Sequence, residues 1–578
     1  MLLKALQHSR RRGAAARRFG SFFLTNNNDN NHNNNNARDE IVLHVGPTNS
    51  GKTYAAMKAL RSASCGVYAG PLRLLAWEAH DDMKRRGIRS QLITGLEREI
   101  PHHCEHVGGD PLPATHTACT VEMLDIRSTP PWDVCVLDEL QMIADENRGW
   151  AWTRALLRAP ARRLHLCGES RCEDLVRRIV CEELNEGDVF TVKRYERLSS
   201  LSVAKTTASL HNVQRGDCIV AFSRQKLYDL KRRIESKGKK QACILYGSLP
   251  PELRRSQADL FNSGGSDVLV ATDAVGMGLN LNIKRVVFTE TEKFDGTAVV
   301  GLSGSQIRQI GGRAGRWKSK YPEGIVTALS ESDLHRVRFA INENPAAKKL
   351  MLKKAGAAPE YEEIETFAKR FGYQDEEYLY NSDGEFDGES DDDGPSFAEM
   401  LESFFDHFLV DRSLYFVCDY EERLQIARLL DHAPLSLREK WIFCNAPVSL
   451  RIPETLATLH DCAECYAEYC DVEMHLRFPG KIPQTPKRML RIENIIKCMD
   501  VYTWLYNQPA IDSEAFVSIQ DVKQARVELS GLLSVGLEAI GDSNAQQISV
   551  SRAMRRLKPS PRGKKRRRAK RRRPRRRL

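Results

Sequence analysis

Short apolar runs alternate with amphipathic stretches between residues 38 and 345. A first series of runs lies at 41–45, 66–69, 134–137 and 164–167, and a second at 218–222, 243–246, 268–271, 285–289 and 324–329. Segments such as 72–86 and 150–158 separate the runs and carry apolar residues at helical spacing. Buried strands that alternate with helices are typical of a parallel sheet covered on both faces. The pattern therefore predicts an α/β fold with two such domains, joined near residues 195–203.

The pattern changes after about residue 345, where we expect no further strands. Helical periodicity dominates the following stretches, for example 346–370, 420–430 and 492–506. Residues 374–395 are rich in Asp, Glu, Gly and Ser, a composition that is typical of disordered segments. We therefore expect a mainly α-helical C-terminal region with an acidic disordered insert.

Charge is concentrated at the two ends of the chain. The net charge is +11, but residues 551–578 alone hold 17 Lys and Arg and no acidic residue. Residues 1–24 are also rich in Arg, free of acids and interleaved with Leu, Ala and Phe, and a run of Asn follows at 26–36. The first composition is typical of a mitochondrial transit peptide and the second of a disordered spacer. A basic N-terminus without a targeting role is the alternative.

The most informative motif is Gly-Pro-Thr-Asn-Ser-Gly-Lys-Thr at 46–53, directly after the apolar run 41–45. A strand, a glycine-bounded loop and Lys-Thr at the start of a helix form the P-loop that holds nucleoside triphosphates. Lys52 is expected to reach the β- and γ-phosphates, and the Thr53 hydroxyl to bind Mg²⁺. The predicted nucleotide-binding residues of the loop are Gly46, Pro47, Thr48, Asn49, Ser50, Gly51, Lys52 and Thr53.

Two carboxylates follow the apolar run 134–137. Asp138 and Glu139 would lie at the carboxyl end of a buried strand, where ligands bind in α/β sheets. We predict that Asp138 holds Mg²⁺, with Mn²⁺ as a substitute, and that Glu139 polarises the attacking water.

A third motif lies in the second domain, at 306–316. Arg313 and Arg316 are three residues apart, among glycines that allow a close approach of the backbone. Such a pair suits contacts to a γ-phosphate as its charge develops, so the ATP site would be shared across the cleft between the domains. The loop at 272–280, which contains Gly278, follows another predicted strand and suggests contacts to ribose or nucleic acid.

Taken together, these motifs resemble those of superfamily 2 helicases. More narrowly, the segments 46–53, 71–78 (PLRLLAWE), 94–97 (TGLE), 138–142 (DELQM), 165–169 (HLCGE), 246–251 (YGSLPP) and 312–316 (GRAGR) are similar to the suppressor-of-var-three family of mitochondrial ATP-dependent RNA helicases, of the DExH or Ski-two-like type and in its plant form. The likeness is strong over residues 40–345 and fainter over 500–550. It implies two tandem RecA-like domains, with ATP and Mg²⁺ as cofactors.

The resemblance also implies roles for individual residues. Gln309 would help to sense the γ-phosphate, and Gln141 would couple hydrolysis to domain closure. Contacts to nucleic acid would come from Pro71, Arg73, Thr94, Gly95, Thr117, Thr120 and Thr272.

The pattern and the resemblance together divide the chain into six parts. These are a transit peptide and Asn-rich spacer (1–37), a first RecA-like, ATP-binding domain (38–200), a second RecA-like domain (201–345), a helical region with the acidic insert 374–395 (346–498), a C-terminal helical segment (499–550) and a polybasic tail (551–578). Asp295-Gly296 between strand-like residues indicates a β-hairpin that could act as a wedge between paired strands, with an ordinary connecting loop as the alternative.

The leading hypothesis is a helicase that unwinds RNA during mitochondrial RNA turnover and surveillance. RNA is the expected partner, with DNA or RNA–DNA hybrids as alternatives, and the resemblance implies an exoribonuclease of a mitochondrial degradosome. The expected location is the mitochondrial matrix; the basic tail leaves the nucleus as an alternative. The sequence contains no run of about 18 apolar residues, so we predict no membrane span. Two other functions stay open: a nuclear or mitochondrial DNA helicase, and an ATP-regulated nucleic-acid-binding scaffold that does not unwind.

Overall fold

The computed structural model describes residues 38–99, 114–183, 189–236, 240–276, 278–343, 351–373, 395–468, 471–475, 483 and 485–540. The predicted transit peptide and spacer, nearly all of the acidic insert and the polybasic tail lie outside the described residues. Among the helices that are described, none combines the length and the apolar character that a membrane span requires.

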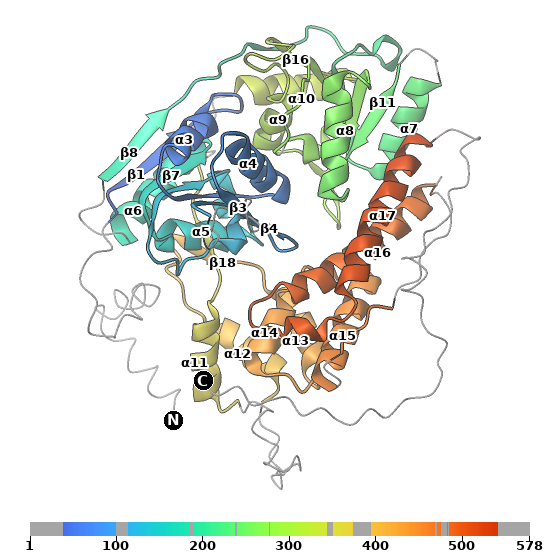
Figure 1. The fold of residues 1–578 in the computed structure, drawn as a ribbon. Coiled ribbons are helices and arrows are strands. Elements are labelled where there is room, and N and C mark those ends of the chain that lie inside the picture. Colours follow the sequence, from blue (N-terminus) through green and yellow to red (C-terminus); the bar gives the residue numbers. More distant parts are fainter. Residues whose placement is uncertain are drawn as a thin grey trace, which may run out of the picture.

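An eight-stranded sheet forms the core of the first domain (Figure 1). In spatial order its strands are β4 (Arg98–Glu99), β3 (Ser90–Ile93), β5 (His116–Thr120), β2 (Gly66–Gly70), β6 (Trp132–Leu137), β7 (Ala161–Gly168), β1 (Glu40–Val45) and β8 (Val189–Arg194). Every pairing except β3 with β4 is parallel. The connecting helices are α3 (Lys52–Arg61), α4 (Arg73–Arg85), α5 (Gly149–Arg158) and α6 (Glu173–Glu183), with the 3-10 turns η2 (Val121–Met123), η3 (Leu140–Ala144) and η4 (Ser170–Cys172).

The second domain is built on a six-stranded, fully parallel sheet. Its strands, in spatial order, are β11 (Ala242–Leu245), β12 (Val268–Ala271), β10 (Asp217–Val220), β13 (Arg285–Phe288), β16 (Gly324–Ala328) and β9 (Leu201–Val203). Its helices are α7 (Arg224–Glu235), α8 (Pro251–Ser263), α9 (Gly304–Gly311) and α10 (Glu331–Asn342), with the turns η5 (Leu210–Asn212) and η6 (Asp273–Gly276). The two sheets confirm the predicted α/β fold, and the antiparallel pair β14 (Glu292–Phe294) and β15 (Val299–Gly301) confirms the predicted hairpin.

The C-terminal region is mainly helical, as expected. Its helices are α11 (Tyr361–Phe371), α12 (Phe397–His407), α13 (Glu421–Leu430), α14 (Leu437–Cys444), α15 (Pro453–Glu468), α16 (Pro486–Tyr506) and α17 (Ile519–Glu538), with the turn η9 (Ser513–Ala515).

The expectation that strands end near residue 345 is wrong, because β17 (Ala355–Ala357) pairs with β18 (Tyr415–Val417). Packing on the first domain decides this pairing, and the sequence Ala-Gly-Ala shows no strand pattern. A Cβ at Gly356 would lie 3.0 Å from the Cα of Gly149 in α5, so the two backbones meet closely.

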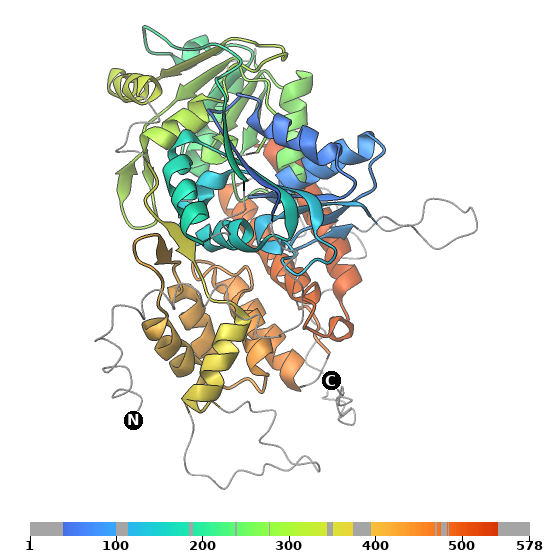
Figure 2. The same ribbon diagram turned by 90° about the vertical axis from the view of Figure 1, so that its left-hand side faces the viewer.

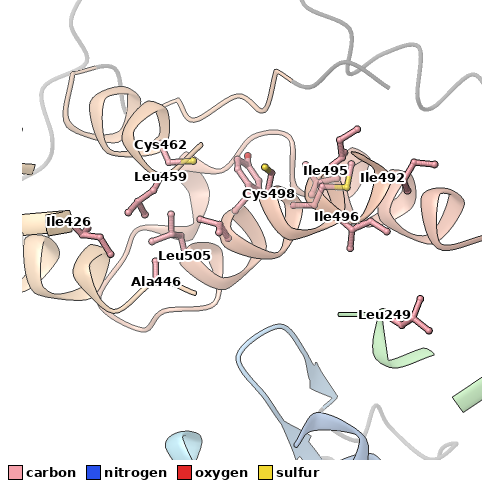
Figure 3. Packing of buried hydrophobic residues seen from close by; sticks show 14 of the residues in the cluster. Leu249, Ile426, Ala446, Leu459, Cys462, Ile492, Ile495, Ile496, Cys498 and Leu505 are labelled. Atoms are coloured by element: carbon pink, nitrogen blue, oxygen red, sulfur yellow. The ribbon is translucent and has the colours of Figure 1, made fainter. Parts of the chain in front are cut away.

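Helices α16 and α17 run from the C-terminal helices to the second domain, where they lie beside α7 and α8 (Figures 1 and 2). One continuous buried cluster includes apolar residues from both parts. Figure 3 shows members of this cluster from the second domain (Leu249), from α15 (Leu459) and from α16 (Ile496). A buried carboxylate adds a polar link: Glu493 of α16 accepts hydrogen bonds from the Tyr246 hydroxyl at 2.6 Å and the Arg224 guanidinium at 2.8 Å. Through these contacts the C-terminal region is joined to the second domain, and through the packing of β17 on α5 it is joined to the first.

Candidate functional site

The P-loop lies between β1 and α3, at the carboxyl end of the first sheet. Its backbone is left-handed at Asn49 and at Gly51, with φ of 62° and 82°. Helix α3 begins at Lys52 without a side-chain cap and without an acidic residue in its first turn, so its first N–H groups can bind an anion. The Lys52 ammonium donates a hydrogen bond to the Pro47 carbonyl at 3.2 Å, which folds it over the same loop.

The two carboxylates predicted after the strand 134–137 follow β6, which is separated from β1 only by β7. The Thr53 hydroxyl donates to Asp138 Oδ1 at 3.2 Å, and the Tyr68 hydroxyl donates to Oδ2 at 3.1 Å. Burial and the neighbouring Glu139 raise the pKa of Asp138 to about 6, although Lys52 opposes the shift. This buried carboxylate would be stabilised by additional positive charge, and oxygen donors of this kind suit Mg²⁺.

Glu139 has a left-handed backbone, with φ of 51°, which is uncommon for a residue with a side chain and costs conformational energy. The Gln141 amide donates a hydrogen bond to the Glu139 carboxylate. The Trp152 indole N–H donates to the Asp138 carbonyl at 3.0 Å and so holds the peptide between Asp138 and Glu139. Tyr68 and Trp152 support the acidic pair, but their spacing in the sequence does not connect them to it.

The arginine motif of the second domain contacts the P-loop directly. It occupies the end of α9 and the following residues, 312–316. The Asn49 amide donates to the carbonyls of Gly312 and Gly315, at 3.2 and 2.8 Å. Glu139 counteracts the lowering of the Arg313 pKa by burial, and so attracts this guanidinium across the cleft. The two predicted halves of the ATP site are thus brought together.

The other predicted residues of this motif lie on the second domain's side of the cleft. Arg313 Nε donates to the Gly276 carbonyl at 3.1 Å, and Arg316 donates to the Asn280 side chain. Gln309 lies beside Gly276, because a Cβ added to that glycine would be 3.5 Å from Gln309 Cγ. Gly278 has φ of 72°, and a Cβ there would be 2.8 Å from Cγ of Leu75 in α4, so this loop packs on the first domain.

A cavity of about 470 Å³ lies where all three parts of the chain meet. The first domain contributes Arg73, Gly95, Leu96, Thr120, Glu122, Met123 and Arg148; the second contributes Gly247, Ser248, Leu249, Pro250, Pro251 and Arg254; the C-terminal region contributes Pro447, Ser449, Thr455, Glu493, Ile496, Lys497, Asp500 and Trp504. Three of the residues that the resemblance associates with nucleic acid, Arg73, Gly95 and Thr120, line this cavity. We call it the channel.

The structure places the remaining four of those residues outside the channel lining. The Thr94 hydroxyl is buried and accepts hydrogen bonds from the backbone of Leu96 and Glu97. The hydroxyl of Thr117 accepts from the Gln91 amide at 2.9 Å, and that of Thr272 from the Ala274 backbone at 3.2 Å. The Pro71 carbonyl accepts a hydrogen bond from the Arg148 guanidinium at 2.7 Å. Pro71 therefore contacts a residue of the channel lining without belonging to the lining.

Cationic side chains from the two domains converge in the channel. Burial and the neighbouring charge of Arg73 lower the pKa of Arg254, which indicates that the two guanidinium groups repel each other. Arg254 Nε is buried and has no hydrogen-bond partner among the described residues. Arg73 lies 3.7 Å from the carboxylate of Asp500 in α16. An anion between Arg73 and Arg254 would satisfy both groups.

Comparison with known proteins identifies the family. Residues 29–195 match the DEXQ-box helicase domain of Suv3, residues 197–318 the helicase conserved C-terminal domain, and residues 425–467 the Suv3 C-terminal domain 1. The chain is 40% identical over 471 residues to the mitochondrial ATP-dependent RNA helicase SUV3 of Oryza sativa subsp. japonica, which covers 80% of this chain and 74% of that protein. The chain belongs to the Suv3 family of ATP-dependent RNA helicases.

Other Suv3 relatives are longer. The chain is 38% identical to the mitochondrial DExH-box helicase DExH18 of Arabidopsis thaliana, over 86% of this chain and 59% of that protein. It is 35% identical to human SUPV3L1, over 87% of this chain and 60% of that protein. The chain therefore spans about three fifths of these two relatives. The matches confirm the family resemblance and the helicase type of both α/β domains.

Proposed function

We propose that this Suv3 family member hydrolyses ATP between its two RecA-like domains and uses that cycle to unwind RNA. The observation that carries the proposal is the direct contact between the P-loop and the arginine motif, through the Asn49 amide and the Gly315 carbonyl. The channel is lined by residues of the same two domains, so opening or closing of the cleft between them also changes the shape of the channel. Coupled movement of this kind is what a translocating motor requires.

The nucleotide would be held from both sides of the cleft. Loop 46–51 and the N-terminus of α3 would hold the phosphates, and Lys52 would leave the Pro47 carbonyl for the β- and γ-phosphates. Thr53 and Asp138, already 3.2 Å apart, would hold Mg²⁺ or Mn²⁺, which neutralises phosphate charge when bound. Arg313 and Arg316 would stabilise the charge that develops on the γ-phosphate.

Glu139 is the residue that we assign to the attacking water. Its carboxylate accepts a hydrogen bond from Gln141, which restrains it beyond the carboxyl end of β6. From there it can orient a water molecule for attack on the γ-phosphate. Gln309 lies beside Gly276, whose carbonyl accepts a hydrogen bond from Arg313. We assign Gln309 to sensing the γ-phosphate from the side of the second domain.

One RNA strand would pass through the channel. Arg73, Arg254 and Lys497 would contact its phosphates, and the indole of Trp504 offers a surface on which a base can stack. The hairpin β14–β15 exposes 64% of Phe294 and 68% of Val299, so its tip offers apolar surface to a duplex. Such a hairpin could act as the wedge that separates a duplex.

We place this activity in the mitochondrial matrix, because the Suv3 relatives are named as mitochondrial. RNA turnover there, with an exoribonuclease as partner, follows from the family resemblance. DNA is the second candidate substrate, because phosphate contacts of the kind expected in the channel do not distinguish DNA from RNA. The polybasic tail and a nuclear location would fit this second candidate.

Replacement of the P-loop lysine tests the proposal directly. We expect Lys52→Ala to lower the turnover number for ATP by at least about 10²-fold and to abolish unwinding, since the lysine stabilises transferred charge. Release of a labelled strand from RNA, DNA and hybrid duplexes measures unwinding. Lys58→Ala, an exposed lysine on the same helix, is the control and should behave as wild type. Unwinding by Lys52→Ala at the wild-type rate would refute the motor function.

The metal assignment has its own test. Asp138→Asn removes the negative charge but retains the side-chain shape, so the Mg²⁺ concentration needed for half-maximal binding of a fluorescent ATP analogue should rise at least about tenfold. Titration of Mg²⁺ after treatment with EDTA measures this change. Asp133→Asn, five residues earlier and bonded to the Ser64 backbone, is the matched control. An unchanged Mg²⁺ requirement in Asp138→Asn would contradict the assignment.

The strand path through the channel is tested by Arg254. We expect Arg254→Met to weaken binding of single-stranded RNA and to reduce the slope of log Kd against log salt by about one, because one phosphate contact is lost. Fluorescence anisotropy at several salt concentrations measures both quantities. Arg255→Met, the next residue of α8, serves as control because Arg255 instead pairs with Asp81 at 2.8 Å. Equal slopes for the wild type and Arg254→Met would place the strand elsewhere.

A further inference from the structure

Arg197 lies in the segment that joins the two domains, and the sequence motifs do not include it. Its guanidinium has five N–H groups, and each one meets a backbone carbonyl. The acceptors are Ser199 at 3.0 Å, Thr48 at 3.0 Å, Gly312 at 2.8 Å, Ala314 at 2.5 Å and Gly315 at 3.0 Å. One side chain thus binds the P-loop, the joining segment and the arginine-bearing loop together.

These contacts are independent of a carboxylate. Among the described residues no ion pair involves Arg197, and its partial burial lowers its pKa to about 10. Five carbonyl dipoles therefore take the place of a counter-ion. Because they come from three separate segments, the arrangement exists only when those segments lie together. A rigid, forked guanidinium can serve such a set, whereas the single ammonium of lysine cannot.

Neighbouring bonds reinforce the same junction. The Leu198 backbone N–H donates to the Asn49 carbonyl at 3.0 Å, and the Ser199 hydroxyl donates to the Gly315 carbonyl at 3.1 Å. The carbonyls of residues 312, 314 and 315 flank Arg313 and precede Arg316. Their anchorage therefore sets where the backbone presents both arginines to the P-loop.

We propose that Arg197 is a positioning residue that holds the arginine-bearing loop against the P-loop before nucleotide or nucleic acid binds, and so sets the rate of ATP hydrolysis in the absence of nucleic acid. The inference rests on the proposed ATPase function. Without Arg197, the Asn49 amide and the Ser199 hydroxyl would still contact this loop, but five of the hydrogen bonds at the junction would be lost, and contacts made by the nucleic acid would supply a larger share of the closure. Loss of Arg197 should therefore reduce the basal rate more than the rate with RNA bound.

The test compares the 578-residue chain as wild type, Arg197→Lys and Arg197→Gln, with Arg194→Gln as matched control. Arg194 lies three residues earlier and forms a surface ion pair with Glu173. ATP hydrolysis is measured with and without saturating single-stranded RNA. Both Arg197 variants should lose about tenfold in basal turnover. Their ratio of RNA-stimulated to basal turnover should rise at least threefold, about half a log unit, while Arg194→Gln matches wild type.

A second measurement separates positioning from general damage. Small-angle scattering without nucleotide should show a larger radius of gyration for Arg197→Gln than for wild type, and a non-hydrolysable ATP analogue with RNA should restore the wild-type value. Wild-type basal turnover in both Arg197 variants, or equal losses with and without RNA, would overturn the inference. If the wild type itself hydrolyses no ATP, the proposed function fails, and the scattering comparison still decides the role of Arg197.

Discussion

The contact between the P-loop and the loop at 312–316 is the constraint on which the rest of the molecule depends. Each sheet is parallel apart from the short β3–β4 pair, so its functional loops gather at the carboxyl ends of its strands. Two such edges can share one nucleotide only if they face each other. Asn49 and Arg197 achieve this without any acidic partner, through hydrogen bonds to the Gly312 and Gly315 carbonyls. The groups that we propose as catalytic then lie on both sides of a cleft whose width is set by neutral backbone groups.

The C-terminal region extends this constraint to the nucleic-acid side. Helix α16 is bound to the second domain through Glu493, whose carboxylate also accepts from the Ser248 hydroxyl at 2.8 Å. Further along the same helix, Asp500 pairs with Arg73, and Trp504 lies against Gly95 of the first domain. A relative movement of the two sheets must therefore change the contacts of α16, and with them the channel. This gives a physical route by which hydrolysis in the cleft can move a strand.

Much of the fold could be predicted, because the strands that carry the chemistry are buried on both faces. The apolar run 134–137 predicts β6, and the motif after it places Asp138 at the sheet edge. The pattern does not predict strand β5, because His116–Thr120 is largely polar in sequence and is buried only by its neighbours. The pattern of apolar positions also does not predict contacts between distant segments. Tyr68 donates a hydrogen bond to Asp138, 70 residues later in the sequence, and Arg197 donates one to Gly312, 115 residues later. Spacing identifies a loop and its motif, whereas the packing of three separate segments decides which arginine joins them.

The proposed hydrolysis of ATP by groups from both domains depends on Arg313. It is tested most directly by measuring ATP affinity and turnover for Arg313→Gln, with and without single-stranded RNA. We expect an affinity close to that of the wild type, because the P-loop is intact, and a turnover number reduced by about 10³-fold in both conditions. Wild-type turnover in Arg313→Gln would contradict a site shared across the cleft.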